Sequence, residues 1–130
     1  MSETVKKETE ITEENVLKAA CATEYSYNLK KPITFEDCTI EKLDFDFGRL
    51  TGADSLAIED ELQAINKPAI IPTLSGQYLI RVAARACTTT LESSNGRTRR
   101  VGVDVLQALP ICDYSRIRSR VRSFLTALEL

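Results

Sequence analysis

One stretch, Leu43–Asn66, changes its hydrophobic period partway along, and this change constrains the fold more than any other feature of the chain. Its first residues alternate apolar and acidic side chains, as a half-buried strand does, and its later residues repeat at helical spacing. The strand pattern is carried by Leu43, Phe45 and Phe47, and the helical pattern by Ile58, Leu62 and Ile65. Gly48 and Gly52 flank the change, and Thr51 or Asp54 can accept the first free amides of the helix. A strand that leads directly into a helix is therefore predicted here.

The residues before this stretch predict its partner strand. Apolar residues alternate from Tyr25 to Phe35, Glu36-Asp37 is a turn candidate, and Thr39–Phe47 forms the returning strand. Pro32 lacks an amide donor, so it should lie at a sheet edge or at a bulge. Because a two-stranded ribbon is marginally stable alone, its apolar face must be covered by helices or by another chain.

Helices are predicted over most of the second half. After an extended link enforced by Pro68 and Pro72, Ser75 caps a helix through Gln77 to about Thr88. This helix is apolar on most sides, so it should form the centre of the core. An exposed loop that turns at Asn95-Gly96 follows, and it could form a small hairpin. A short helical turn is then predicted over Val103–Leu109. The last helix is predicted to have Asp113 as its N-cap, and its apolar face consists of Tyr114, Ile117, Val121, Phe124, Leu125 and Leu128.

These elements predict an α+β fold: an N-terminal antiparallel β-hairpin followed by a bundle of about four α-helices. A chain of 130 residues suits one domain, which we place at 25–130. Residues 1–24 are expected to be a flexible acidic arm, with a short helix available from Asn15 to Ala20. No apolar run approaches the roughly 20 residues of a membrane span, and the start lacks a secretory signal, so a cytoplasmic location without a membrane is expected.

The reactive residue types predict a protein without catalysis, cofactor or metal. The four cysteines show no C-x-x-C spacing and the chain has no histidine, which disfavours a zinc site and removes the usual general base. No glycine pattern for cradling phosphates is present. Asp46-Phe47-Gly48 copies a kinase tripeptide by chance, since the rest of the kinase signature is missing. Asp44 and Asp46 share a strand face and could hold a cation, but a solvated strand face requires the same residues.

Charge is divided unevenly along the chain. Residues 1–65 carry 7 Lys and Arg against 15 Asp and Glu, whereas residues 66–130 carry 10 against 4. This division can support self-association or docking on a charged partner, or it can cancel across the folded surface. The sequence pI of 5.3 disfavours nucleic-acid binding. That alternative would use Arg97, Arg99, Arg100, Arg116, Arg118, Arg120 and Arg122.

The order of several segments resembles the tail assembly chaperones of long-tailed bacteriophages. The resemblance covers roughly residues 29 to 125 and depends on this order more than on one motif. Its segments are Pro32-Ile-Thr-Phe, Arg49-Leu-Thr-Gly-Ala-Asp-Ser-Leu, Gln77-Tyr-Leu-Ile-Arg-Val-Ala-Ala-Arg-Ala, Leu109-Pro-Ile-Cys-Asp-Tyr and Val121-Arg-Ser-Phe-Leu. The loop from Thr88 to Gly102 is longer than the family's link, and the arm before Tyr25 has no counterpart.

The resemblance implies a non-enzymatic protein of the host bacterial cytoplasm, absent from the mature virion. Such a protein binds the phage tape-measure protein and helps tail-tube protein to assemble on it; a homo-oligomer is left open. On the last helix we expect partner contacts from Tyr114, Ile117, Arg118, Val121 and Phe124. Their alternative role is complete burial in the monomer. Other functions that stay open are a virion structural or connector adaptor and an Arg-rich nucleic-acid-binding regulator.

Overall fold

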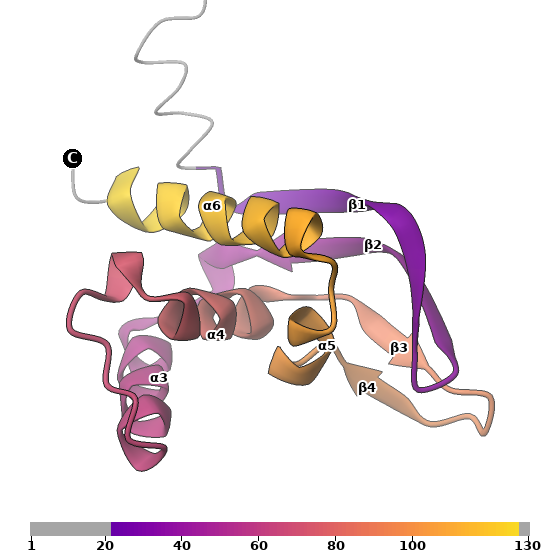
Figure 1. Cartoon of the computed structure of the whole chain (residues 1–130), viewed down its shortest axis with the longest axis horizontal. Coiled ribbons are helices and arrows are strands. Elements are labelled where there is room, and N and C mark those ends of the chain that lie inside the picture. The colour runs from indigo at the N-terminus through magenta and orange to yellow at the C-terminus, as the bar shows by residue number, and fades with distance from the viewer. Residues whose placement is uncertain (1–21, 128–130) are drawn as a thin grey trace, which may run out of the picture.

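The computed structural model describes residues 22–127, which Figure 1 shows as a β-hairpin followed by helices. This confirms the predicted α+β fold class. The predicted arm and its helical piece lie, apart from residues 22–24, outside the described residues. The elements are β1 (Glu24–Phe35), β2 (Cys38–Asp46), the 3-10 turn η1 (Phe47–Arg49), α3 (Gly52–Ala64), the 3-10 turn η2 (Pro72–Leu74), α4 (Gly76–Ala86), β3 (Thr90–Glu92), β4 (Thr98–Arg100), α5 (Val103–Gln107) and α6 (Ile111–Ala127).

The predicted hairpin is formed by β1 and β2, which pair antiparallel. Glu36 and Asp37 make the turn with φ of 47° and 65°, the left-handed backbone that a two-residue hairpin requires. The register breaks between Asn28 and Ile33, so Pro32 lies in an irregular part of the ladder, as its missing amide donor predicts. The break lets the strands bend near Pro32, which has no backbone N–H to donate to the partner strand.

The change of period after β2 occurs where it was predicted, but the strand ends at Asp46, so Phe47 lies in η1 and this 3-10 turn separates the strand from α3. The backbone N–H of Thr51 donates to Asp54 Oδ2 at 2.8 Å, which satisfies a free amide where α3 begins. Ile58 and Leu62 face the core and are fully buried. The helix ends at Ala64, so Ile65 follows it and is about half exposed instead of continuing the buried face.

The apolar helix α4 lies at the centre of the domain, in contact with α3, α5 and α6. Ser75 Oγ accepts a hydrogen bond from the backbone N–H of Tyr78 at 3.2 Å, which confirms the predicted cap. The helix stops at Ala86, two residues before the predicted end, because Cys87 is extended and bridges to Phe45 of β2. The chain then continues into β3 and β4, which form the small hairpin around Asn95-Gly96.

The last helix does not begin as predicted. Asp113 is not its N-cap, because α6 starts at Ile111 and the carbonyl of Pro110 already accepts the N–H of Tyr114 at 3.0 Å. This start places Asp113 in the first helical turn, facing β1 and only 1% exposed. There its Oδ1 accepts a hydrogen bond from the hydroxyl of Tyr27 at 2.5 Å. A buried carboxylate needs such a donor, so the pair fastens α6 to β1.

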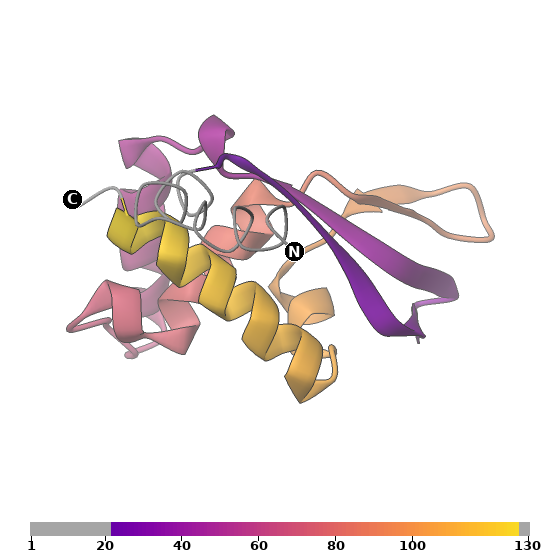
Figure 2. The ribbon, with the colours of Figure 1, turned by 90° about the horizontal axis from the view of Figure 1, so that it is seen from above.

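An aromatic row joins α6 to the hairpin. Phe47 stacks on Phe124 with ring centroids 5.0 Å apart, and the row continues through Phe45 to Tyr25. Figure 2 shows α6 running alongside β1, so these contacts close one side of the core. The last predicted member of the apolar face of α6, Leu128, lies outside the described residues.

Candidate partner-binding site

The five residues predicted to contact a partner divide into a buried and an accessible group. Ile117, Val121 and Phe124 are buried in the core of the chain. Tyr114 is half-buried and Arg118 is exposed, and both lie on the side of α6 that faces the start of α4 and η2. In this conformation only the accessible pair can contact another molecule.

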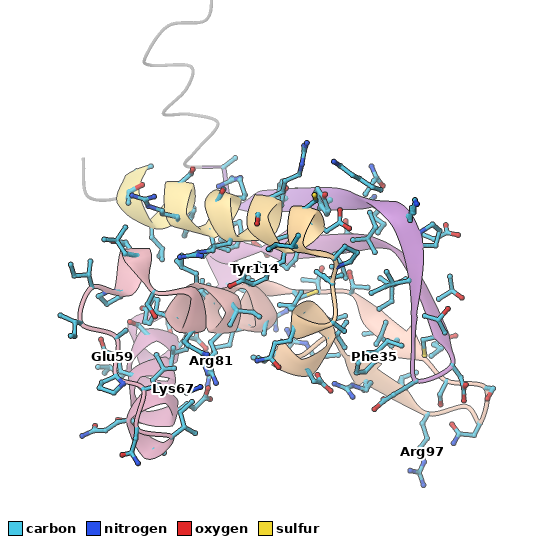
Figure 3. The ribbon with its side chains drawn as sticks, in the orientation of Figure 1. Phe35, Glu59, Lys67, Arg81, Arg97 and Tyr114 are labelled. Atoms are coloured by element: carbon cyan, nitrogen blue, oxygen red, sulfur yellow. The ribbon has the colours of Figure 1, made fainter. Side chains whose placement is uncertain are left out.

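Tyr114 and Arg118 hold α6 against the start of α4. The guanidinium of Arg118 donates from Nη2 to the carbonyl oxygen of Leu74 at 3.0 Å. Tyr114 approaches Gly76 so closely that a Cβ at that position would lie 3.0 Å from the phenol oxygen. A glycine at the first position of α4 therefore gives the tyrosine ring its place between the two helices, where Figure 3 labels it.

Beside Tyr114 the surface is hollowed into what we name the α4–α6 groove. Its volume is about 500 Å³, and its floor includes the buried side chains of Ile80 and Leu109. Ile111 stands at its edge with 78% of its surface exposed. The complete lining is Ser75, Gly76, Gln77, Ile80, Gln107, Leu109, Ile111 and Tyr114. Amides and a hydroxyl thus border an apolar floor, which is the composition of a protein-binding surface.

The segment that leads into the groove is also apolar and exposed. We name Ile70–Leu74 the isoleucine loop; Ile70 is 94% exposed, and Ile71 and Leu74 are each about half exposed. Two prolines, Pro68 and Pro72, bracket the isoleucines; Pro72 keeps Ile71 extended and begins the 3-10 turn η2, which contains Leu74. Leu74 directly precedes Ser75, so the loop leads into the part of the groove that the start of α4 lines. Scattered apolar residues on a surface are ordinary, but a cluster beside a groove indicates a contact site.

Sequence reasoning missed this surface. It assigned the contacts to the apolar face of α6, and it treated residues 67–73 only as a link. A signal was available, since Ile70 and Ile71 lie between prolines, where no helical or strand period can bury them. Ile111 gave no comparable signal, because its exposure depends on where α6 begins.

Asp44 and Asp46, weighed above as a cation site, are each engaged locally. Asp44 accepts a hydrogen bond from Ser26 Oγ and lies 3.6 Å from the ammonium of Lys42. Asp46 accepts the backbone N–H of Gly48 at 3.0 Å, where η1 begins. Among residues 22–127, no group of three or more His, Cys, Asp or Glu side chains is arranged to hold a metal ion.

The arginines do not gather into one surface. Arg99 donates to both Glu36 and Asp104, and these carboxylates raise its pKa further. Arg100 donates to the carbonyl of Cys87 at 2.8 Å. Arg97 directly precedes β4 and lies well away from α6 in Figure 3. The loop and helix arginines therefore lie in separate places on the molecule, and several have partners within the chain.

Two of the cysteines are core residues, as expected for small apolar side chains. Cys38 and Cys87 are buried and Cys112 is exposed, and all three carry free thiols. Burial raises the pKa of the Cys87 thiol, which disfavours the reactive thiolate. Cys21 lies outside the described residues.

Comparison with known proteins gave no match to a family model, to a curated protein or to a solved structure. In the part of the chain that the structure describes, no helix is both long enough and apolar enough to cross a membrane.

Proposed function

We propose that this chain is a non-enzymatic binding protein that shields apolar surface on another protein. More particularly, we propose a bacteriophage tail assembly chaperone that binds the tape-measure protein. The observation that carries the proposal is the α4–α6 groove with the isoleucine loop leading into it, where Ile70 is 94% and Ile111 78% exposed. The order of sequence segments shared with the chaperone family supports the particular assignment.

The groove suits an amphipathic helix better than an extended strand. Its floor is made by side chains of α4, α6 and the connection between α5 and α6, with no free strand edge to extend. Recognition of a helix in such a groove uses apolar anchors at every third or fourth residue, with polar groups at the border. Full burial of one isoleucine side chain contributes about 1.5–3 kcal/mol, so a few anchors suffice for reversible binding.

Reversible binding is what a chaperone of this kind requires. The tape-measure protein is long and prone to aggregate before tail-tube protein surrounds it, so it must be held and then released. We therefore place the protein in the cytoplasm of the host bacterium and expect it to be absent from purified virions. Its presence there at a fixed ratio to the tail-tube protein would instead identify a virion component.

Co-expression with the tape-measure protein encoded by the same phage tests the proposal. We expect the soluble fraction of the tape-measure protein to rise with the wild-type chain and to fall back with Ile111→Glu or Ile70→Glu. Leu56→Glu is the matched control, because Leu56 is 63% exposed on α3 and lies outside the groove lining. The control should retain the wild-type effect. Equal solubility with and without the chain would refute the proposal.

A further inference from the structure

The guanidinium of Arg118 lies where the α4–α6 groove meets the isoleucine loop. Its Nη2 donates to the carbonyl oxygen of Leu74, the last residue of the loop, at 3.0 Å. Its Cζ lies 3.7 Å from where a Cβ on Gly76 would stand, and Gly76 lines the groove. A partner that covers the groove and the loop together must therefore also cover this positive charge.

Arg118 has no acidic partner in the described part of the chain. Other arginines do: Arg99, for example, lies 2.7 Å from a carboxylate oxygen of Asp104. The side chain of Arg118 is exposed, and no carboxylate within residues 22–127 forms an ion pair with it. One carbonyl oxygen holds the guanidinium in place and leaves its other N–H donors open to a ligand.

The groove itself supplies nothing that could neutralise this charge. None of the residues that line it is acidic or basic. The side-chain oxygen of Gln77, which lies in the lining, already accepts a hydrogen bond from Arg81 Nη1 at 2.7 Å. Removing a guanidinium from water costs free energy unless an acceptor replaces the water. The acceptor must therefore come from the partner.

We propose that the partner helix carries an aspartate or glutamate within its apolar face, and that Arg118 binds this carboxylate. The inference rests on the proposed function and names the chemistry of the segment that is bound. A helix laid across the groove and the isoleucine loop places apolar anchors in both, and residues three or four apart share one of its faces. A carboxylate between the anchors then meets the guanidinium at the junction.

Charge complementarity makes this residue a determinant of specificity. A wholly apolar helix would cover Arg118 without supplying an acceptor, and a lysine at the same position would add repulsion between like charges. A carboxylate instead forms a charge-assisted hydrogen bond, which is stronger than a neutral one. Nucleic acid fits less well, because it gains affinity from many phosphate contacts and the floor of this groove is apolar.

The test uses the full chain and two fluorescein-labelled helical peptides of about 18 residues, long enough to form a helix on binding. Both carry leucines three or four residues apart along one face; the central residue of that face is glutamate in one peptide and glutamine in the other. All other positions are uncharged. Fluorescence anisotropy at low salt gives the ratio of the two dissociation constants for each variant of the chain.

The wild-type chain should bind the glutamate peptide about fivefold more tightly, the upper end of what a partly exposed ion pair contributes. Arg118→Gln should reduce this ratio to about one, whereas Arg118→Lys, which keeps the charge, should retain most of it. Arg116→Gln is the matched control and should leave the ratio unchanged. Arg116 is exposed on the same helix but lines a hollow against β1.

The ratio separates recognition of charge from positioning of the loop. If Arg118 only holds Leu74 in place, Arg118→Gln lowers the affinity of both peptides equally and the ratio stays at its wild-type value, which would overturn the inference. A wild-type ratio near one, or an equal fall in Arg116→Gln and Arg118→Gln, would overturn it as well.

A further variant distinguishes failure of this inference from failure of the proposed function. Ile111→Glu should weaken both peptides together, because it changes the edge of the groove and not Arg118. If it does so while the ratio in the wild type is near one, the groove binds helices and only the role of Arg118 is wrong. If neither peptide binds, or Ile111→Glu leaves both affinities unchanged, the proposed function fails and the inference fails with it.

Discussion

Replacing Tyr27 by Phe tests the buried contact that positions α6. The substitution removes the hydroxyl that donates to Asp113 and keeps the ring that packs in the core. Within residues 22–127, Asp113 would then keep only the distant backbone N–H of Lys30, at 3.5 Å. A carboxylate that is 1% exposed would be left with almost no donor.

We expect Tyr27→Phe to lower the free energy of unfolding by about 2–3 kcal/mol at pH 7. Hydrogen bonds to charged groups contribute about 1.5–3 kcal/mol, and the buried acceptor that loses its donor adds to the cost. The loss should be larger than for a surface hydroxyl, because water cannot replace the donor at a buried site. Removing both partners should cost less than the sum of the single changes.

Urea unfolding of Tyr27→Phe, Asp113→Ala and the double variant measures the coupling directly. Tyr25→Phe is the matched control, since its hydroxyl has no hydrogen-bond partner among the described residues; it should change stability by less than about 0.5 kcal/mol. A coupling free energy below about 0.5 kcal/mol between Tyr27 and Asp113 would refute the assigned role of the pair.

The same pair predicts how stability changes in alkali. The hydrogen bond to Asp113, with burial, raises the pKa of Tyr27 from 10.0 to about 12. The folded state therefore binds this proton more tightly than the unfolded state, so the contribution is complete below pH 10 and is lost as pH rises towards 12. Through this window the free energy of unfolding should fall more steeply with pH in the wild type than in Tyr27→Phe, because the variant lacks this hydroxyl. Identical slopes in the two proteins would contradict the assignment.

Other predictions concern the start of α4, the turn of the small hairpin and the thiols. Ser75→Ala should lower the free energy of unfolding by about 1 kcal/mol, because the N–H of Tyr78 loses its acceptor; urea titration measures this. Gly96→Ala should lower the free energy of unfolding by about 1 kcal/mol, because residue 96 has a φ of 81°. Gly52→Ala should not lower it, because a Cβ at residue 52 would meet open space. Among the described thiols of the native chain, Cys112 should react with a maleimide well before Cys38 and Cys87. Mass spectrometry of the digested protein shows the order of reaction. Equal rates would contradict the burial of Cys38 and Cys87.

Local patterns predicted the hairpin and α4 because their decisive contacts are local. The turn at Glu36-Asp37 joins adjacent strands, and the Ser75 cap acts three residues away. Asp113 was misassigned for the opposite reason. Aspartate is a good N-cap, but α6 already begins at Ile111, and the partner of Asp113 comes from β1, 86 residues away.

The candidate site was predicted less well than the fold. An apolar helical stripe shows that a face is buried, but it does not show whether the same chain or another covers it. In this chain the domain's own core covers Ile117, Val121 and Phe124, since α6 packs on α4 and β1 and Phe124 stacks on Phe47 of η1. The accessible apolar surface of the site comes instead from the isoleucine loop, which its prolines signalled locally, and from Ile111, whose exposure depends on where α6 begins.

Amide hydrogen exchange tests the central claim most directly, that the groove and the isoleucine loop bind the tape-measure protein. The full chain would be compared alone and in complex with that protein. Slower exchange over residues 70–77 and 107–114, with no change in α3, is the predicted result. A complex that protects only other segments, or a tape-measure protein that leaves exchange in both segments unchanged, would contradict it.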